Sequence, residues 1–278
     1  MKEEKVRKIV RKRYGNVAKN SSSCCASSGS SCGCTPVTSG DISRKIGYSE
    51  EELSSVPEGA NLGLGCGNPI ALASLKEGET VLDLGSGAGF DCFLAAKKVG
   101  KKGKVIGVDM TPEMLDKGRA NAKKGKYTNV EFRLGEIENL PVADQSVNVI
   151  ISNCVINLSP NKRQVFKEAY RVLAPNGRLM VSDIVLLDEL PKELKENAQA
   201  YTSCISGAEL KEKYLNLIKD AGFKEVKVID ETNFPVDFIT SDTTQKFIKT
   251  LGTSAEKIKK IEKSVVSIKV SATKTLKN

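Results

Sequence analysis

The chain has 278 residues, enough to bury a large core as one α/β domain with appendages or to form two small domains. Hydrophobic residues make up 40% and charged residues 28%, which are ordinary values for a soluble globular protein. No apolar run approaches the roughly 20 residues of a membrane span, and the start, MKEEKVRKIV, lacks a secretory signal. We therefore expect a cytoplasmic protein with no membrane partner.

The net charge of +9 is concentrated at the two ends of the chain. Residues 1–13 hold seven Lys and Arg against two Glu, and residues 255–278 hold seven Lys against two Glu. The body between them is close to neutral, so the basic ends are best explained as solvated segments that aid solubility. With eight Phe, six Tyr and no Trp, surfaces on which bases could stack are scarce. We expect no nucleic-acid partner.

Two segments precede the regular part of the sequence. Residues 1–18 predict a short basic helix, and residues 19–40 predict a flexible segment rich in Cys and Ser. The flexible segment contains Cys24, Cys25, Cys32 and Cys34 in SSSCCASSGSSCGC, which has no apolar face.

Strand and helix patterns alternate from residue 79 onward, which predicts βαβ units and a mainly parallel sheet. We assign a central domain to residues 41–230 and an extension that completes the sheet to residues 231–278. The closely spaced last strands leave room for one antiparallel edge. The expected strands are 80–85, 104–109, 129–135, 147–153, 178–185, 224–230 and 264–274, and the expected helices are 90–100, 111–124, 162–173 and 207–222, with Thr111 as an N-cap.

A glycine-rich loop, GSGAG at 85–89, follows the first buried strand and opens a helix. The next strand ends on Asp109, which could hold the ribose hydroxyls of a ligand containing a nucleoside. A nicotinamide fingerprint would require glycine where Phe90 stands. Asp83, just before the glycines, is suited to a cationic group that a pyrophosphate site would not offer.

These motifs resemble those of class I S-adenosylmethionine methyltransferases: VLDLGSGAG with VIGVDMT, and GEIENLPVADQSVNVIISN as the adenine-binding stretch. The resemblance covers about residues 60–230. It implies the Rossmann-like class I methyltransferase fold, a mostly parallel seven-stranded sheet with helices on both faces and a small C-terminal extension. It also implies a set of cofactor residues: Asp83, Gly85, Gly87 and Gly89 at the methionine end, Asp109 at the ribose, Met110, Glu136 and Ile137 around the adenine, and Asn153 near the amino-acid moiety.

Three of the remaining cysteines flank strands at the edge where ligands bind in such sheets. Cys66 precedes the first strand in GLGCGNP, Cys154 follows the fourth strand, and Cys204 lies between the fifth strand and the next helix. Any one of them alone is more commonly a small buried hydrophobe, but three together could converge beside the cofactor. Cys92 has apolar spacing within a helix and is expected in the core.

The stretches GLGCGNP, SNCVINL and CISGA are similar to those of the arsenite methyltransferases, a subfamily of this fold. The resemblance implies that Cys66, Cys154 and Cys204 bind trivalent arsenic, presented as arsenite or its thiol conjugates, for detoxification. It further implies S-adenosylmethionine as cofactor and a thiol reductant, thioredoxin or a small thiol, as partner. Soft thiolates select such a soft acceptor. Trivalent arsenic keeps a lone pair and has no proton to remove, which is compatible with a chain that contains no histidine.

Several interpretations stay open at this point. Some arsenite methyltransferases have an N-terminal cysteine pair, so Cys24 and Cys25 either add arsenic or redox capacity or are thiols without a role. The enzyme could instead methylate a small organic acceptor such as a quinone precursor, because GEIENLP is also similar to that group. A thiol-based metalloid sensor without turnover is a third possibility. The glycines around Cys66 also predict a mobile loop that closes over the cofactor.

Overall fold

A computed structural model describes residues 3–20, 38–191, 195, 201, 204–234 and 263–275. Cys24, Cys25, Cys32 and Cys34 lie outside the described residues, as does most of the segment predicted to be flexible. The described residues at the two ends of that segment belong to helices, because the first helix ends at Asn20 and the second begins at Ser39. Within the described residues, no helix is long and apolar enough to span a membrane.

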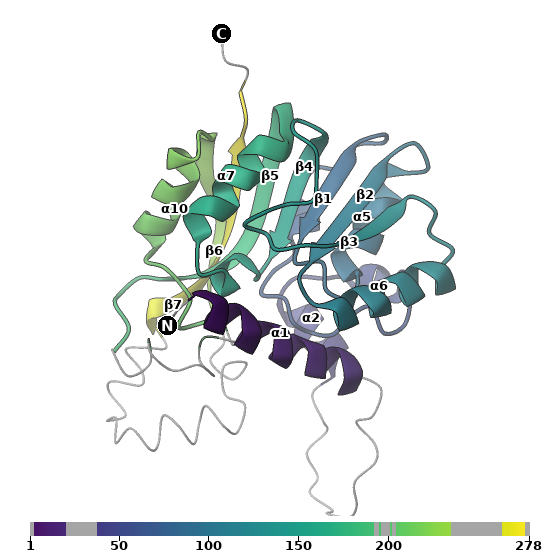
Figure 1. Cartoon of the computed structure of the whole chain (residues 1–278), viewed down its shortest axis with the longest axis horizontal. Coiled ribbons are helices and arrows are strands. Elements are labelled where there is room, and N and C mark those ends of the chain that lie inside the picture. Colours follow the sequence, from purple (N-terminus) through teal and green to yellow (C-terminus); the bar gives the residue numbers. More distant parts are fainter. Residues whose placement is uncertain are drawn as a thin grey trace, which may run out of the picture.

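One seven-stranded sheet forms the centre of the molecule, in the order β3-β2-β1-β4-β5-β7-β6 (Figure 1). The strands are β1 (Thr80–Leu84), β2 (Lys104–Asp109), β3 (Val130–Leu134), β4 (Val147–Asn153), β5 (Leu173–Leu186), β6 (Lys224–Asn233) and β7 (Val265–Thr273). β1 to β5 run parallel, and β7 is antiparallel to both of its neighbours. The predicted fold class is confirmed.

The position of the antiparallel strand differs from the prediction. It is not at the edge: β7 lies between β5 and β6, and β6 is the edge strand. The burial patterns give the reason, because most residues of β7 are buried on both of its faces, whereas the side chains of β6 are exposed or only half-buried. β5 is also longer than predicted, since Leu173 already pairs with Val147 before the register shifts.

Helices cover both faces of the sheet because successive strand residues point in opposite directions. Leu82 and Leu84 of β1 belong to a core cluster with residues of α7 (Lys162–Val172) and α10 (Lys211–Asp220). Val81 belongs to a cluster on the other face with residues of α4 (Pro69–Leu72) and α5 (Phe90–Val99). α6 (Pro112–Lys124) packs along β3. As predicted, Cys92 is fully buried in this second cluster.

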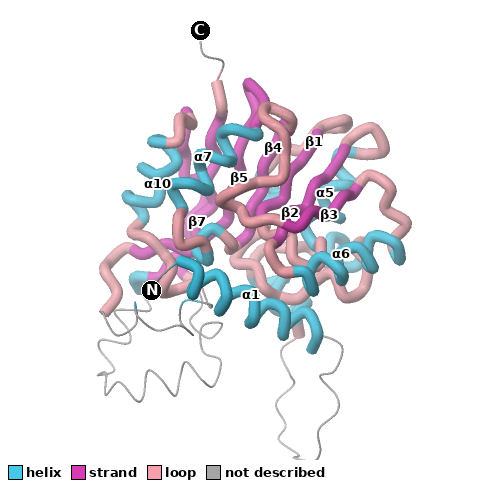
Figure 2. The backbone as a smooth tube through the Cα atoms, in the orientation of Figure 1, coloured by secondary structure: helices cyan, strands magenta, loops and turns pink. Residues whose placement is uncertain are grey.

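The N-terminal helices lie at the edge where the parallel strands end, which we call the carboxyl edge (Figures 1 and 2). α1 (Glu3–Asn20) runs along this edge toward α6, and the short helices α2 (Ser39–Lys45) and α3 (Glu50–Ser54) follow. Capping boxes at Thr38 and Ser49 define where α2 and α3 begin. Residues of α1 and α2 line one side of a cavity at this edge.

Candidate active site

A cavity opens at the carboxyl edge, above the loop between β1 and α5. Most of the residues predicted around a cofactor line it: Asp83, Gly85, Gly87, Asp109, Met110, Ile137 and Asn153. Cys154 also lines the cavity, so the cofactor-like pocket and one of the predicted thiols share a wall.

The glycine-rich loop is shaped by positive backbone angles and by close approach. Gly85 has φ +68°, and a Cβ there would overlap the side chain of Val155. Gly87 has φ +52° and donates its N–H to Asp109 Oδ2 over 3.0 Å. A Cβ on Gly87 would meet only Met114 Sδ at 3.9 Å, so the space above it is open for a ligand.

Asp109 ends β2 with its carboxylate held in place by backbone donors. Besides Gly87, the N–H of Thr111 donates to Oδ1 over 2.8 Å. Burial raises the pKa of Asp109, although these hydrogen bonds and one from the Thr111 side chain lower it. Thr111 occupies the predicted N-cap position of α6, but its side chain does not cap that helix. It interacts with the Asp109 carboxylate instead.

Two residues predicted at the cofactor do not line the cavity. Gly89 is the N-cap of α5 with φ +93°, and a Cβ there would come within 2.7 Å of the Phe132 ring, so packing explains this glycine. Glu136 turns toward α1 and forms ion pairs with Arg7 and Arg11. Glu138, two residues further on, lines the cavity instead and accepts a hydrogen bond from Ser159 Oγ over 2.7 Å.

A buried polar network that the sequence did not predict adjoins Asp83. Tyr48 donates to Asp91 Oδ1 over 2.6 Å, and Asn153 Nδ2 donates to Asp91 Oδ2 over 3.1 Å. Burial, followed by the charge of Asp91, raises the pKa of Asp83 well above its ordinary value, and burial raises that of Asp91 to about 6. Neither carboxyl forms a salt bridge within the described part of the chain, so the pair is suited to a cationic ligand group.

The raised pKa of Asp91 predicts a pH-dependent stability of the ligand-free protein. Because the folded protein keeps this proton up to about pH 6 whereas the unfolded chain loses it near pH 4, stability falls as pH rises through that window. As pH rises from 4 to 7, we expect the free energy of unfolding of the wild type to fall by up to about 3 kcal/mol relative to that of Asp91→Asn. Urea unfolding across this range measures the change, with the exposed Asp220→Asn as control. Parallel curves for Asp91→Asn and wild type would contradict the assignment.

Cys66 is fixed in place by neighbouring strands. Its N–H donates to Asn153 Oδ1 over 3.0 Å, its carbonyl accepts from Ser267 Oγ over 2.9 Å, and its Sγ lies 3.6 Å from the carbonyl of Ser182. A Cβ on Gly67 would overlap the Ser182 hydroxyl, so this glycine is required by close approach. The loop predicted to be mobile is thus packed against β4 and β5 in this structure.

Cys154 and Cys204 both adopt the left-handed backbone region, with φ +60° and +63°. Residues other than glycine rarely adopt this backbone conformation, and those that do are often found at functional sites. The Cys204 thiol donates to the Cys154 carbonyl over 3.1 Å. Hydrogen bonds with Cys204 and Cys66, followed by burial, raise the pKa of Cys154, and burial raises that of Cys66. The structure therefore brings Cys66, Cys154 and Cys204 together, and we call them the thiol cluster.

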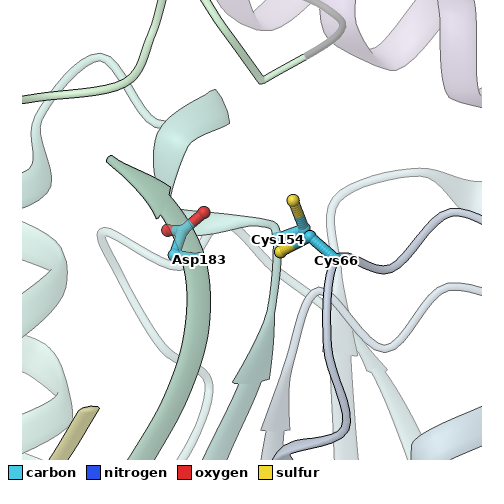
Figure 3. Close-up of side chains that lie close together, drawn as sticks. All are labelled: Cys66, Cys154 and Asp183. Carbon is cyan, nitrogen blue, oxygen red and sulfur yellow. The ribbon is translucent and has the colours of Figure 1, made fainter. Parts of the chain in front are cut away.

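Asp183 of β5 is a further neighbour of this cluster (Figure 3). One of its carboxylate oxygens and the Sγ atoms of Cys66 and Cys154 all lie within 4.8 Å of one another. Asn157 Nδ2 and the Tyr214 hydroxyl donate to this carboxylate over 2.8 and 3.1 Å, and burial raises its pKa to about 7. The sequence carried a signal for it, because the polar pair Ser182–Asp183 interrupts an otherwise apolar strand.

Known methyltransferases are similar to this chain in sequence. The family model described as methyltransferase domain matches residues 75–222. Arsenite methyltransferase of Halobacterium salinarum is 50% identical over 230 residues, covering 81% of this chain and 59% of that protein. Arsenite methyltransferase of Aquipseudomonas alcaligenes is 37% identical over 250 residues, covering 85% of this chain and 67% of that protein.

A solved structure is also similar. The crystal structure of an arsenic(III) S-adenosylmethionine methyltransferase from Chlamydomonas reinhardtii has a TM-score of 0.62 and 31% identity, covering 84% of this chain and 73% of that one. The chain spans about three-fifths to two-thirds of the length of the two curated relatives above. The domain match, the identities and the shared fold place the chain in the arsenite methyltransferase family of S-adenosylmethionine-dependent methyltransferases.

Proposed function

We propose that the protein transfers a methyl group from S-adenosylmethionine to trivalent arsenic held by the thiolates of Cys66, Cys154 and Cys204, in arsenic detoxification. The observation that carries the proposal is the thiol cluster, in which three buried thiols from three separate segments meet and Cys154 also lines the cavity. Three sulfur ligands satisfy the three bonds of trivalent arsenic and leave its lone pair free to accept the methyl group.

The cavity fits the cofactor on two grounds. The buried pair Asp83 and Asp91 is suited to the ammonium group of the methionine end, and the open space above Gly87 admits a ligand close to the backbone. Asp109 would hold the ribose, and Met110 and Ile137 would border the adenine. The cofactor supplies an electrophilic methyl group, and the chain orients the acceptor toward it and excludes water.

Substrate capture is a condensation between thiols and arsenite. Each S–H proton leaves with one arsenic-bound hydroxide as water, so three sulfur–arsenic bonds replace three oxygen–arsenic bonds.

Because the cysteines must be reduced, a thiol reductant, thioredoxin or a small thiol, is the proposed partner, and the cytoplasm is the proposed location. The four described cysteines are all free. We also propose residues 41–230 as the catalytic domain, with Cys24 and Cys25 as accessory thiols.

One assay tests the proposal directly. The reduced protein is incubated with arsenite, glutathione and S-adenosylmethionine, and the arsenic products are separated and counted. Methylated arsenic supports the proposal. Arsenite and cofactor binding without product would point to a metalloid sensor. A protein in which all three cysteines are replaced by serine but which still methylates a quinone precursor would point to an organic acceptor.

The cofactor site has its own test in Asp109→Ala. Removing charge-assisted hydrogen bonds to the ribose should weaken S-adenosylmethionine binding by about 1.5–3 kcal/mol, or roughly 10- to 150-fold in Kd. Calorimetric titration measures this change, and the exposed Asp116→Ala on α6 serves as the control. Unchanged affinity in Asp109→Ala would rule out the assigned ribose contact.

A further inference from the structure

The helix α1 contacts the thiol cluster, although its sequence indicated only a solvated basic segment. Val6, Val10 and Tyr14 repeat every four residues and therefore lie on one face of the helix. Val6 and Val10 are 4% and 2% exposed, and they share an apolar cluster with all three cysteines, against which Tyr14 packs. The apolar face of α1 thus packs against the cluster that contains the thiols.

Ion pairs hold α1 against the loop that follows β3. Arg7 Nε lies 3.2 Å from Glu136, and its guanidinium also lies 3.4 Å from the largely buried Glu138. Lys19, at the other end of the helix, pairs with Glu113 of α6 over 2.9 Å. Attachment at both ends places the intervening residue Tyr14 at a defined point, where it lines the cavity.

Tyr14 packs against the apolar cluster that contains Cys204 and Cys154, and it lines the cavity together with Cys154. The Cys204 S–H donates to the Cys154 carbonyl. The Cys204 sulfur is therefore available to accept a hydrogen bond, and a phenol O–H such as that of Tyr14 is a suitable donor. Burial, followed by the charges of Cys204 and Cys154, raises the pKa of Tyr14, which keeps the hydroxyl protonated as a donor.

We propose that Tyr14 is a positioning residue for arsenic binding: its hydroxyl orients the Cys204 sulfur, and α1 forms one wall of the thiol site. This inference rests on the proposed function. A hydroxyl donor suits both states of the site, because the sulfur accepts its hydrogen bond as a thiol and more strongly as an arsenic-bound thiolate. Val6 and Val10 keep water from the same sulfur atoms.

The experiment compares Tyr14→Phe with wild type by calorimetric titration of the full, reduced chain with arsenite. We expect the Kd for arsenite to rise about tenfold, the loss typical of one hydrogen bond to a charged group. The KM for arsenite should rise similarly, while the Kd for S-adenosylmethionine stays within about twofold. Tyr201→Phe is the matched control, since its hydroxyl donates to the Leu158 carbonyl rather than to a thiol.

A double-mutant cycle separates positioning from packing. In a Cys204→Ser background, Tyr14→Phe should cause no further loss of arsenite affinity, because the sulfur that it orients is absent. An equal loss in both backgrounds, or no loss in Tyr14→Phe alone, would overturn the role of Tyr14 and leave the proposed function intact. Wild-type protein that neither binds nor methylates arsenite would instead refute the proposed function itself.

Discussion

Replacing Cys154 or Cys204 by serine should abolish methylation of both inorganic and monomethylated arsenic, whereas Cys66→Ser should retain activity on the monomethylated form. Inorganic arsenite has three valences for sulfur, and the monomethylated form has two. The Cys204 thiol donates to the backbone carbonyl of Cys154, so the two residues are neighbours, and we expect their sulfurs to form the two-sulfur complex. Loss of either should lower the rate on the order of 10³-fold or more, the scale seen when a residue bonded to the substrate is removed.

Steady-state rates for both substrates in each single variant decide this prediction. The affinity for S-adenosylmethionine is the control, because serine at these positions leaves Asp83 and Asp109 unchanged. If Cys66→Ser is as inactive as the other two on both substrates, all three sulfurs belong to an obligatory site, and Cys154 and Cys204 alone do not suffice for the monomethylated form.

Gly67→Ala should lower arsenite methylation about 100-fold without weakening cofactor binding. A Cβ at this position would overlap the Ser182 hydroxyl, so the loop must shift and carry Cys66 with it. A displacement of about 1 Å at a reacting group can cost that much in rate. The overpacking should also cost about 1–3 kcal/mol of stability, measurable by urea unfolding.

The matched variant for this test is Ser182→Ala. Among the described residues the Ser182 hydroxyl has no hydrogen-bond partner, so its removal alone should be neutral or slightly stabilising. The double variant Gly67→Ala with Ser182→Ala should recover most of the activity, because the methyl group then occupies the space that the hydroxyl vacates. Full activity in Gly67→Ala alone would show that the loop moves freely, as its glycine content first predicted.

The local features of the fold could be predicted from the sequence because they depend on residues close together in the chain. Alternating apolar runs and helical spacings predicted β1 to β4 and their helices nearly to the residue. The glycine-rich loop and Asp109 were recognisable because a strand, a turn and a helix follow one another directly. The spacing of Cys66, Cys154 and Cys204 relative to strand ends predicted their common edge.

Contacts between distant segments were decided only by the tertiary structure. The place of β7 inside the sheet depends on which strand buries both faces, and strand patterns alone do not give that order. Glu136 turns toward α1 and away from the cavity because that helix, more than 120 residues earlier in the chain, supplies the arginines that pair with it. Tyr48, Asp91 and Asp183 join the site for the same reason, because each forms a buried hydrogen bond with a partner far away in the chain. Tyr14 joins it by packing against the cluster that contains the three cysteines. Local periodicity carries no information about such pairs.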